Sequence, residues 1–156
     1  MNSLPLTYEG DPVLKTVCSE VTVFDDELKE FSEIMLNTMR LHDGVGLAAP
    51  QVGSTKRIIV TNFEPFVFVN PVISEGTGKQ KYREGCLSFP DLFLDVDRYQ
   101  HVRVEYNDLE GNDCWVQASG RDAVIMQHEI DHLNGIVFTT RVNSMALMLA
   151  YKKQKW

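Results

Sequence analysis

The stretch DAVIMQHEIDHL, residues 122–133, decides how the fold of this chain is interpreted. Its apolar residues recur at helical spacing, and its leading half is almost wholly apolar. A surface helix would carry a broad polar face, so this pattern predicts a helix that is buried against a sheet. Asn134 and Gly135 follow directly, and both residue types commonly end helices. The stretch therefore predicts a core helix.

Two histidines on this predicted helix form a candidate metal site. His128 and His132 are four residues apart, so their imidazoles project from nearly the same face, about 6 Å apart along the axis. Glu129 projects to the side, where a carboxylate can act as a base on a metal-bound water without being a ligand. The alternative is a helix with two surface histidines. The apolar flanks weigh against it, because burying unpaired imidazoles is costly.

A catalytic metal site usually has three protein ligands and one open position, so a further ligand must come from another segment. The stretch EGCLSFP, residues 84–90, supplies Cys86 in a turn that follows a glycine, between strand-like segments. Cys18 and Cys114 are weaker candidates, since Cys18 lies in a segment expected to be helical and Cys114 lies in a strand pattern. Taken alone, Cys86 would be interpreted as a small buried hydrophobic residue.

A third unusual stretch is GVGLAAPQVG, residues 44–53. Its glycines permit positive φ and a close approach of the backbone to a ligand, and Gln51 is a polar residue in small, apolar surroundings. Taken alone, the stretch is read as a turn. It is not a phosphate-binding P-loop, because the Gly-Lys-Ser/Thr ending is absent.

The rest of the chain predicts one amphipathic helix, several strands and a terminal helix. Apolar residues at steps of three and four predict a helix from Asp25 to His42, with Asp25 and Asp26 as caps and Gly44 as the stop. Residues 143–156 predict a short helix with a basic end, whose last residues fray. β-branched and aromatic runs predict short antiparallel strands at residues 57–62, 66–73, 101–108 and 114–119.

The composition is that of one ordinary globular domain. With 156 residues, of which 44% are hydrophobic and 24% charged, the chain can build a real core, and we expect a single domain over residues 1–156. The net charge of −7 argues against binding to nucleic-acid phosphates. No signal-peptide pattern is present, and no apolar run approaches the roughly 20 residues of a membrane span, which predicts a cytoplasmic protein. Three cysteines are an odd and sparse set, which argues against a disulfide scaffold.

The three unusual stretches together resemble the signature motifs of the peptide deformylase family. GVGLAAPQ, EGCLS and QHEIDHLNG occur in the same chain order as in that family. The resemblance extends to GDPVLKTVC near the start, and the separation between Cys86 and His128 is also typical of the family. The resemblance implies an α+β fold with mostly antiparallel sheets around a central helix that carries the HEIDH motif.

The resemblance also implies an activity and a role for each motif residue. The activity is removal of the formyl group from the N-terminal formylmethionine of newly made peptides, with release of formate, when a metal-bound hydroxide attacks the formyl carbon. Glu129 would be the general acid and base. The side-chain amide of Gln51 and the backbone N–H of Leu87 would bind the oxygen of the tetrahedral intermediate. The metal ligands would be Cys86, His128 and His132.

The substrate and cofactor follow from the same resemblance. The substrate would add a strand to the backbones around Val45, Gly46 and Gly85. One divalent metal ion is implied, with Fe²⁺ as the native ion and Zn²⁺, Ni²⁺ or Co²⁺ as substitutes. The implied partners are N-formylmethionyl peptides, in a bacterial-type cytosol or an organelle, without direct binding to nucleic acid or membranes. An apolar pocket for the methionine side chain would be formed near Val45, Tyr82, Val124 and Ile125.

Some positions depart from the family pattern. Phe93 and Val124 stand where many members have basic residues, and only YKKQKW remains of the charged C-terminal helix that many bacterial members use near the ribosomal exit tunnel.

A zinc endopeptidase would share the helix motif but generally uses a third histidine or a carboxylate instead of Cys86. A non-catalytic metal-stabilised module would be favoured if Glu129 or Gln51 were replaced, and both are present.

Overall fold

Two antiparallel sheets and three α-helices make up the computed structural model, which describes residues 2–154. The larger sheet has the strand order β1-β2-β3-β6-β7, and the smaller sheet is the hairpin β4-β5. The α+β fold expected from the sequence is thereby confirmed. The strands are β1 Gly46–Ala48, β2 Ile58–Thr61, β3 Val67–Thr77, β4 Gln80–Cys86, β5 Phe89–Arg98, β6 His101–Asn107 and β7 Asp113–Ser119.

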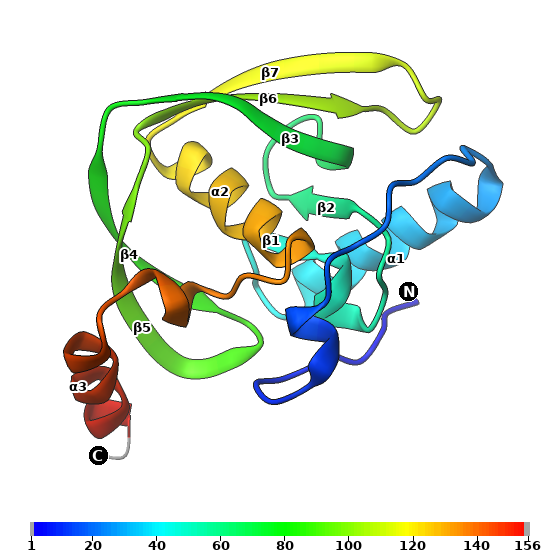
Figure 1. Cartoon of the computed structure of the whole chain (residues 1–156). Helices are drawn as coiled ribbons and strands as arrows, with labels where there is room; N and C mark the ends of the chain where they lie inside the picture. The colour runs from blue at the N-terminus through cyan, green and yellow to red at the C-terminus, as the bar shows by residue number, and fades with distance from the viewer. Residues whose placement is uncertain (1, 155–156) are drawn as a thin grey trace.

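The helix α2, Arg121–Leu133, runs through the middle of the molecule, with the larger sheet on one side and the β4-β5 hairpin on the other (Figure 1). Every residue from Ala123 to Leu133 is buried, as the apolar pattern predicted. Met126 is fully buried against residues of the large sheet, and a side chain of this size contributes about 1.5–3 kcal/mol when removed from water. The central core comprises Cys18, Ala48, Ile59, Phe68, Val102, Val104, Ala118, Ala123, Met126, Ile130 and Leu133.

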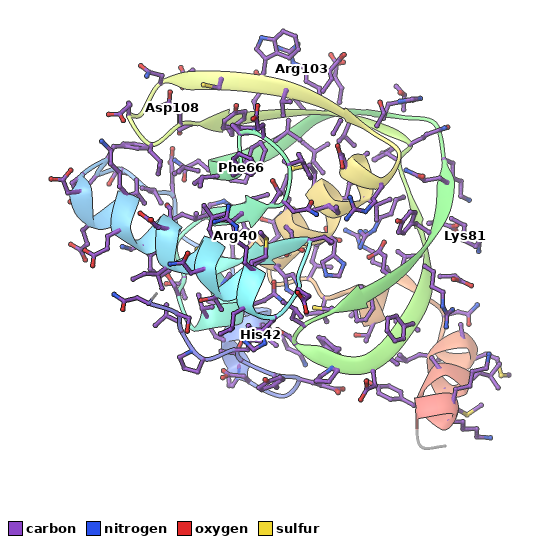
Figure 2. The ribbon with its side chains drawn as sticks, turned by 180° about the vertical axis from the view of Figure 1, so that it is seen from behind. Arg40, His42, Phe66, Lys81, Arg103 and Asp108 are labelled. Atoms are coloured by element: carbon purple, nitrogen blue, oxygen red, sulfur yellow. The ribbon has the colours of Figure 1, made fainter. Side chains whose placement is uncertain are left out.

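The helix α1, Asp26–Leu41, covers the large sheet near β1 and β2 (Figures 1 and 2). Asp25 is the N-cap, and its carboxylate accepts a hydrogen bond of 3.0 Å from Leu28 N–H, as predicted. The end differs slightly from the expectation, because the residue in the left-handed region is Asp43, with φ 54°, rather than Gly44. The helix buries Leu28, Met35 and Met39 against Leu47, Ile58, Val60 and Val69.

The four predicted strands are confirmed as β2, β3, β6 and β7, and all their pairings are antiparallel. Pro71 lies inside β3, where it cannot donate to the ladder, and the register shifts between Val69 and Val72. Asn70 lies at the shift with a positive φ of 52°, as expected of a bulge that accommodates a proline. The strand-like segments expected on either side of the Cys86 turn are β4 and β5, whereas β1 was not predicted.

The N-terminal segment differs from the expectation around Cys18. A short 3-10 helix, η1, covers Pro12–Lys15, but Cys18 lies beyond it in non-helical backbone. The N–H of Cys18 donates a 2.8 Å hydrogen bond to Leu133 O at the end of α2. The helical assignment of Cys18 was therefore wrong, since contact with α2 takes priority over local propensity.

The chain end forms the predicted helix α3, Ser144–Gln154, which packs on β5. The connecting 3-10 helix η3, Phe138–Arg141, lies between α2 and α3, and another, η2, covers Ala49–Val52. The prediction that the last residues fray concerns residues 155–156, which lie outside the described part. Among residues 2–154, no helix is both long and apolar enough to cross a membrane.

Candidate active site

His128, His132 and Cys86 meet where α2 crosses the end of β4. The two histidines are 7% and 1% exposed, and their ring centroids are 5.1 Å apart. Cys86 is the last residue of β4, just before the tight turn to β5, and its Sγ lies 3.4 Å from His132 Nε2. One candidate ligand atom from each of the three residues lies within 4.8 Å of the others. Three donors from two distant motifs thus surround one point.

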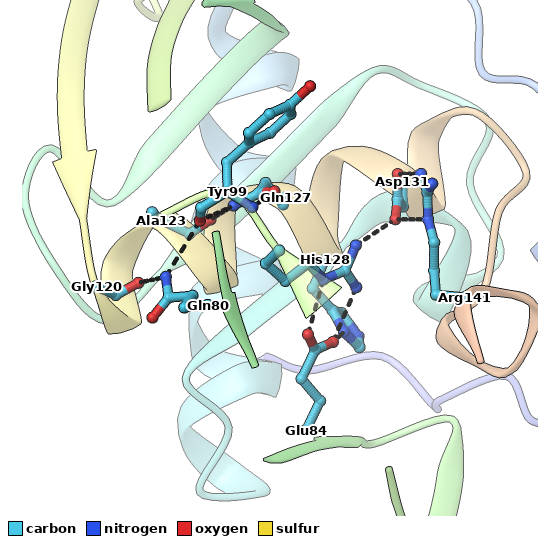
Figure 3. A network of polar contacts seen from close by, with 10 residues as sticks. Gln80, Glu84, Tyr99, Gly120, Ala123, Gln127, His128, Asp131 and Arg141 are labelled. Atoms are coloured by element: carbon cyan, nitrogen blue, oxygen red, sulfur yellow. Dashed lines mark hydrogen bonds and ion pairs between the residues drawn. The ribbon is translucent and has the colours of Figure 1, made fainter. Parts of the chain in front are cut away.

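The imidazole of His128 is oriented by a buried carboxylate. Its Nδ1 lies 2.7 Å from Glu84 Oε1, and Glu84 also receives hydrogen bonds of 2.7 and 2.9 Å from Arg98 (Figure 3). With the Nδ1–H donated to Glu84, the lone pair of Nε2 remains for a cation. Glu84 is only 4% exposed, so the position of the ring is fixed from inside the fold.

The same network continues along α2 to the 3-10 helix η3. Arg98 also donates a 2.7 Å hydrogen bond to Asp131, one turn beyond His128 on α2. Arg141 in η3 then holds Asp131 with two hydrogen bonds of 2.7 and 3.0 Å (Figure 3). The hairpin that carries Cys86 is therefore tied by ion pairs to the helix that carries both histidines.

Glu129 lies beside the three donors as a buried carboxylate. Its Oε1 and the Nδ1 of His132 are buried and have no hydrogen-bond partner among residues 2–154. Burial raises the pKa of Glu129 to about 7, and the charge of His128 opposes this shift. A carboxyl group with such a pKa can both accept and return a proton near neutral pH.

The pKa values of the two histidines move in opposite directions. Burial alone would lower the pKa of His128, but hydrogen bonds with the Cys86 thiol and the Glu84 carboxylate raise it well above its usual value. Burial and the neighbouring charge of His128 hold the pKa of His132 well below its usual value. A thiolate and two imidazoles are the donors that zinc and iron(II) accept, so the residues present fit a divalent transition metal.

Gln51 points its amide toward these donors from η2. Its Oε1 accepts a 2.9 Å hydrogen bond from Ala48 N–H, which fixes the orientation of the amide group. Its Nε2 then lies 3.5 Å from Cys86 Sγ and 3.2 Å from Ser88 Oγ. Gln51 is 1% exposed, so its N–H donors are preorganised in a site that excludes most water.

Two adjoining cavities open onto this group. The larger, about 510 Å³, is bordered by Gln51, Leu87 and Glu129 together with Val45, Gly46 and Gly85. The smaller, about 200 Å³, is lined by Val45, Tyr82, Val124 and Ile125 and also reaches His128 and Glu129. The structure thus brings together every site residue expected from the sequence.

A side chain at either of two glycines in these cavities would have to displace a neighbouring side chain. A Cβ at Gly46 would lie 2.7 Å from Glu129 Oε2, and a Cβ at Gly85 would lie 2.9 Å from the Phe93 ring. The β1 and β4 backbones can therefore approach the site closely because these positions are glycine. Phe93 itself borders the larger cavity and is half exposed.

Three residues of the site were not predicted from the sequence, and two cysteines lie away from it. Glu84, Arg98 and Asp131 were not predicted as a group, since no sequence spacing links them. Cys18 is buried in the core, and Cys114 lies on β7 with its Sγ 3.9 Å from Asp108 Oδ2. Neither of these cysteines belongs to the cluster of Cys86, His128 and His132.

Comparison with known proteins gives one consistent result. The family model for polypeptide deformylase matches residues 3–147. A peptide deformylase from Desulfotalea psychrophila is 41% identical, with 100% of this chain and 98% of the relative covered. The crystal structure of a Synechococcus elongatus peptide deformylase in complex with actinonin superposes with a TM-score of 0.91 at 43% identity, covering 98% of this chain and 86% of that one. That of the Thermotoga maritima enzyme gives a TM-score of 0.88 at 38% identity, covering 92% and 99%. The chain therefore belongs to the polypeptide deformylase family.

Proposed function

We propose that this protein removes the formyl group from N-formylmethionyl peptides by hydrolysis, with release of formate. The observation that carries this proposal is the cluster of Cys86, His128 and His132, with Glu129 and Gln51 beside it, at a cavity that adjoins a smaller one with an apolar wall. The proposed catalytic groups would thus lie beside the space for the first side chain of the peptide.

Cys86, His128 and His132 would hold one divalent cation. When bound, such a cation lowers the pKa of a water molecule and polarises a carbonyl oxygen. The family is metal-dependent, and we propose Fe²⁺ as the native ion, with Zn²⁺, Ni²⁺ or Co²⁺ able to replace it. The donor set supports a transition metal rather than Mg²⁺ or Ca²⁺, which prefer oxygen ligands.

Glu129 is the proposed general acid and base. Its carboxylate takes a proton from the attacking water and returns it to the amide nitrogen as the bond to the formyl carbon breaks. Gln51 Nε2 and the backbone N–H of Leu87 donate hydrogen bonds to the former carbonyl oxygen while negative charge develops on it. A donor of this kind typically contributes about 3–4 kcal/mol to the transition state.

The peptide would bind as an added strand between two sheet edges. Strand β1 is an edge of the larger sheet, and β4 belongs to the two-stranded hairpin, so Val45, Gly46 and Gly85 present backbone groups across the larger cavity. The methionine side chain would enter the smaller cavity between Val45, Tyr82, Val124 and Ile125. Backbone hydrogen bonds do not depend on the side chains of the peptide, whereas the small cavity selects the side chain of its first residue.

The proposed selectivity for formyl groups rests on size. A formyl carbon carries only hydrogen beside its oxygen and nitrogen, so a cramped site accepts it and excludes longer acyl groups. An endopeptidase must instead accommodate chain on both sides of the bond. The thiolate ligand, together with Gln51 held 3.5 Å from it, supports deformylation over the endopeptidase alternative.

We also propose the cellular setting and extent of the unit. Residues 1–156 would act as a single catalytic domain in the cytosol, on peptides that emerge from the ribosome. Docking near the exit tunnel would depend on the short basic end of the chain.

Formate release tests the proposed function. Protein purified anaerobically is incubated with formyl-Met-Ala-Ser and, in parallel, with acetyl-Met-Ala-Ser, while metal content is determined on the same sample. We expect formate from the first peptide, no acetate from the second, and about one metal ion per chain. Release of both acyl groups, or cleavage of an internal peptide bond, would contradict the proposal.

A further inference from the structure

The smaller cavity carries a charged residue that neither its apolar walls nor the proposed chemistry explains. Arg121, Val124, Ile125 and His128 all border this cavity and all lie on α2. Their spacing of three, four and seven residues places them on one face of the helix. Arg121 therefore lies two turns from the metal-site histidine, about 10 Å along the axis, beyond the apolar wall.

The local structure gives Arg121 no stabilising role. It is the first residue of α2, where the helix dipole disfavours a positive charge, and the N-cap Gly120 offers no side chain to compensate. Its side chain is exposed and makes no hydrogen bond or ion pair with any residue in the described range 2–154. An arginine at this position is thus neutral or unfavourable for folding.

The other charged groups of the cavity are already engaged. Glu84 is held by Arg98 and His128, and Glu129 faces the proposed reaction centre. Arg83 lies 3.5 Å from Asp95 and stacks over the Phe93 ring at 5.8 Å. Arg121 is the free cation of this cavity, and its guanidinium offers only hydrogen-bond donors.

We propose that Arg121 makes the first-residue pocket accept side chains of methionine length that end in a hydrogen-bond acceptor, with methionine sulfoxide as the natural example. The proposal rests on the proposed function, because it names a further substrate of the same site. Oxidation converts the apolar thioether of methionine into a polar sulfoxide. An apolar pocket would leave that oxygen without a partner, whereas the guanidinium of Arg121 can donate to it through a charge-assisted bond.

The test compares two peptides that differ only at the end of the first side chain. The substrates are formyl-norleucyl-Ala-Ser, whose side chain is apolar throughout, and formyl-methionine sulfoxide-Ala-Ser. The proteins are the wild type, Arg121→Leu, Arg121→Lys and the control Arg40→Leu. Arg40 is an exposed helical arginine on α1 that borders neither cavity (Figure 2). The measurement is kcat/KM from formate release.

Arg121→Leu should lower kcat/KM for the sulfoxide peptide about tenfold relative to the norleucine peptide, because one charge-assisted hydrogen bond is lost. For Arg121→Lys, this ratio of kcat/KM values should lie between those of the wild type and Arg121→Leu. For Arg40→Leu, it should equal that of the wild type. An unchanged ratio of the two kcat/KM values in Arg121→Leu overturns the inference. Failure of the proposed function is a separate result, namely that the wild type releases no formate from the norleucine peptide. Norleucine turnover by each variant also shows that it is folded.

Discussion

Arg98 and Glu84 form a buried bidentate pair, with hydrogen bonds of 2.7 and 2.9 Å between side chains that are each 3% exposed. Glu84 Oε1 also lies within hydrogen-bond distance of His128 Nδ1, and Arg98 donates a further hydrogen bond to Asp131. Because Glu84 and Cys86 share β4, the pair fixes two of the proposed ligands relative to each other. The geometry of the site thus depends on an arginine that contacts none of the ligands directly.

Replacing Arg98 with Met should therefore weaken both folding and metal retention. The change leaves Glu84 and Asp131 buried without the cation between them, and breaking such a pair costs about 3–5 kcal/mol. Urea unfolding and the rate of metal release to a chelator measure the two effects. Lys29→Met is the matched control, since Lys29 pairs with Glu110 at 3.1 Å on the exposed surface. Equal behaviour of the two variants would contradict this role for Arg98.

The pKa of Glu84 predicts how stability changes in acid. Burial alone would raise it, but hydrogen bonds from Arg98 and His128 outweigh burial and lower it below 4.5. The carboxylate of Glu84 is thus protonated at a lower pH in the folded state than in the unfolded state. The contribution to stability is complete above pH 4.5 and is lost as pH falls through the lower, folded value.

Glu84→Gln should be less stable than the wild type at neutral pH, and the difference should narrow in acid. Urea unfolding at about pH 7 and about pH 3 gives the free energies of unfolding for both proteins. A difference that stays constant over this range would show that the charge of Glu84 is not what stabilises the fold.

Glu129→Gln separates catalysis from metal binding. Glu129 is not among the three clustered donors, so the nearly isosteric amide should leave the metal in place. Turnover of formyl-Met-Ala-Ser should fall by about 10²–10⁴, the usual contribution of general acid–base catalysis, or more. Metal analysis and formate release on the same sample check both parts. A variant that lost the metal would show that the roles are misassigned.

The central helix α2 and the shared face of His128 and His132 could be predicted from the sequence because their information is local. The spacing of His128, Glu129 and His132 defines one helix face, and the buried apolar half of that stretch identifies a core helix. The β5 strand was expected only as an unbounded strand-like segment after the Cys86 turn, and its alternation defines it: Leu92, Leu94 and Val96 are buried between exposed residues.

The supporting network could not be predicted, because it depends on tertiary pairing. Arg98 and Glu84 face each other only through the register of the β4-β5 hairpin, and Asp131 joins them from α2. A buried arginine in a sequence looks like a surface arginine until its carboxylates are located. The conformation predicted for Cys18 was wrong for the same reason, since its backbone N–H bonds to Leu133 O and does not follow the local helical preference.

The C-terminal helix is more firmly attached than its basic sequence suggests. Tyr151 is half-buried in the cluster around β5, and its hydroxyl donates a 2.6 Å hydrogen bond to Glu9. Deletion of residues 151–156 should lower the melting temperature yet leave turnover of short peptides intact, because no residue of either active-site cavity lies there. Tyr151→Phe should reproduce part of the loss. A large drop in peptide turnover on deletion would show that α3 also shapes the site.

The identity of the metal should determine how the enzyme tolerates oxygen. Cys86 is only half-buried, so an Fe²⁺–thiolate site there is open to oxygen and peroxide, whereas zinc binds the same donors without redox chemistry. We expect iron-loaded protein to be the fastest form and to lose activity in air, nickel- or cobalt-loaded protein to keep its activity, and the zinc form to be stable but slower. Formate release from equally loaded samples, before and after peroxide, measures this order. Mass spectrometry of the inactivated iron form should find metal loss, oxidation at Cys86 or both. A zinc form as fast as the iron form, together with an iron form that survives peroxide, would remove the case for iron while leaving the deformylase chemistry in place.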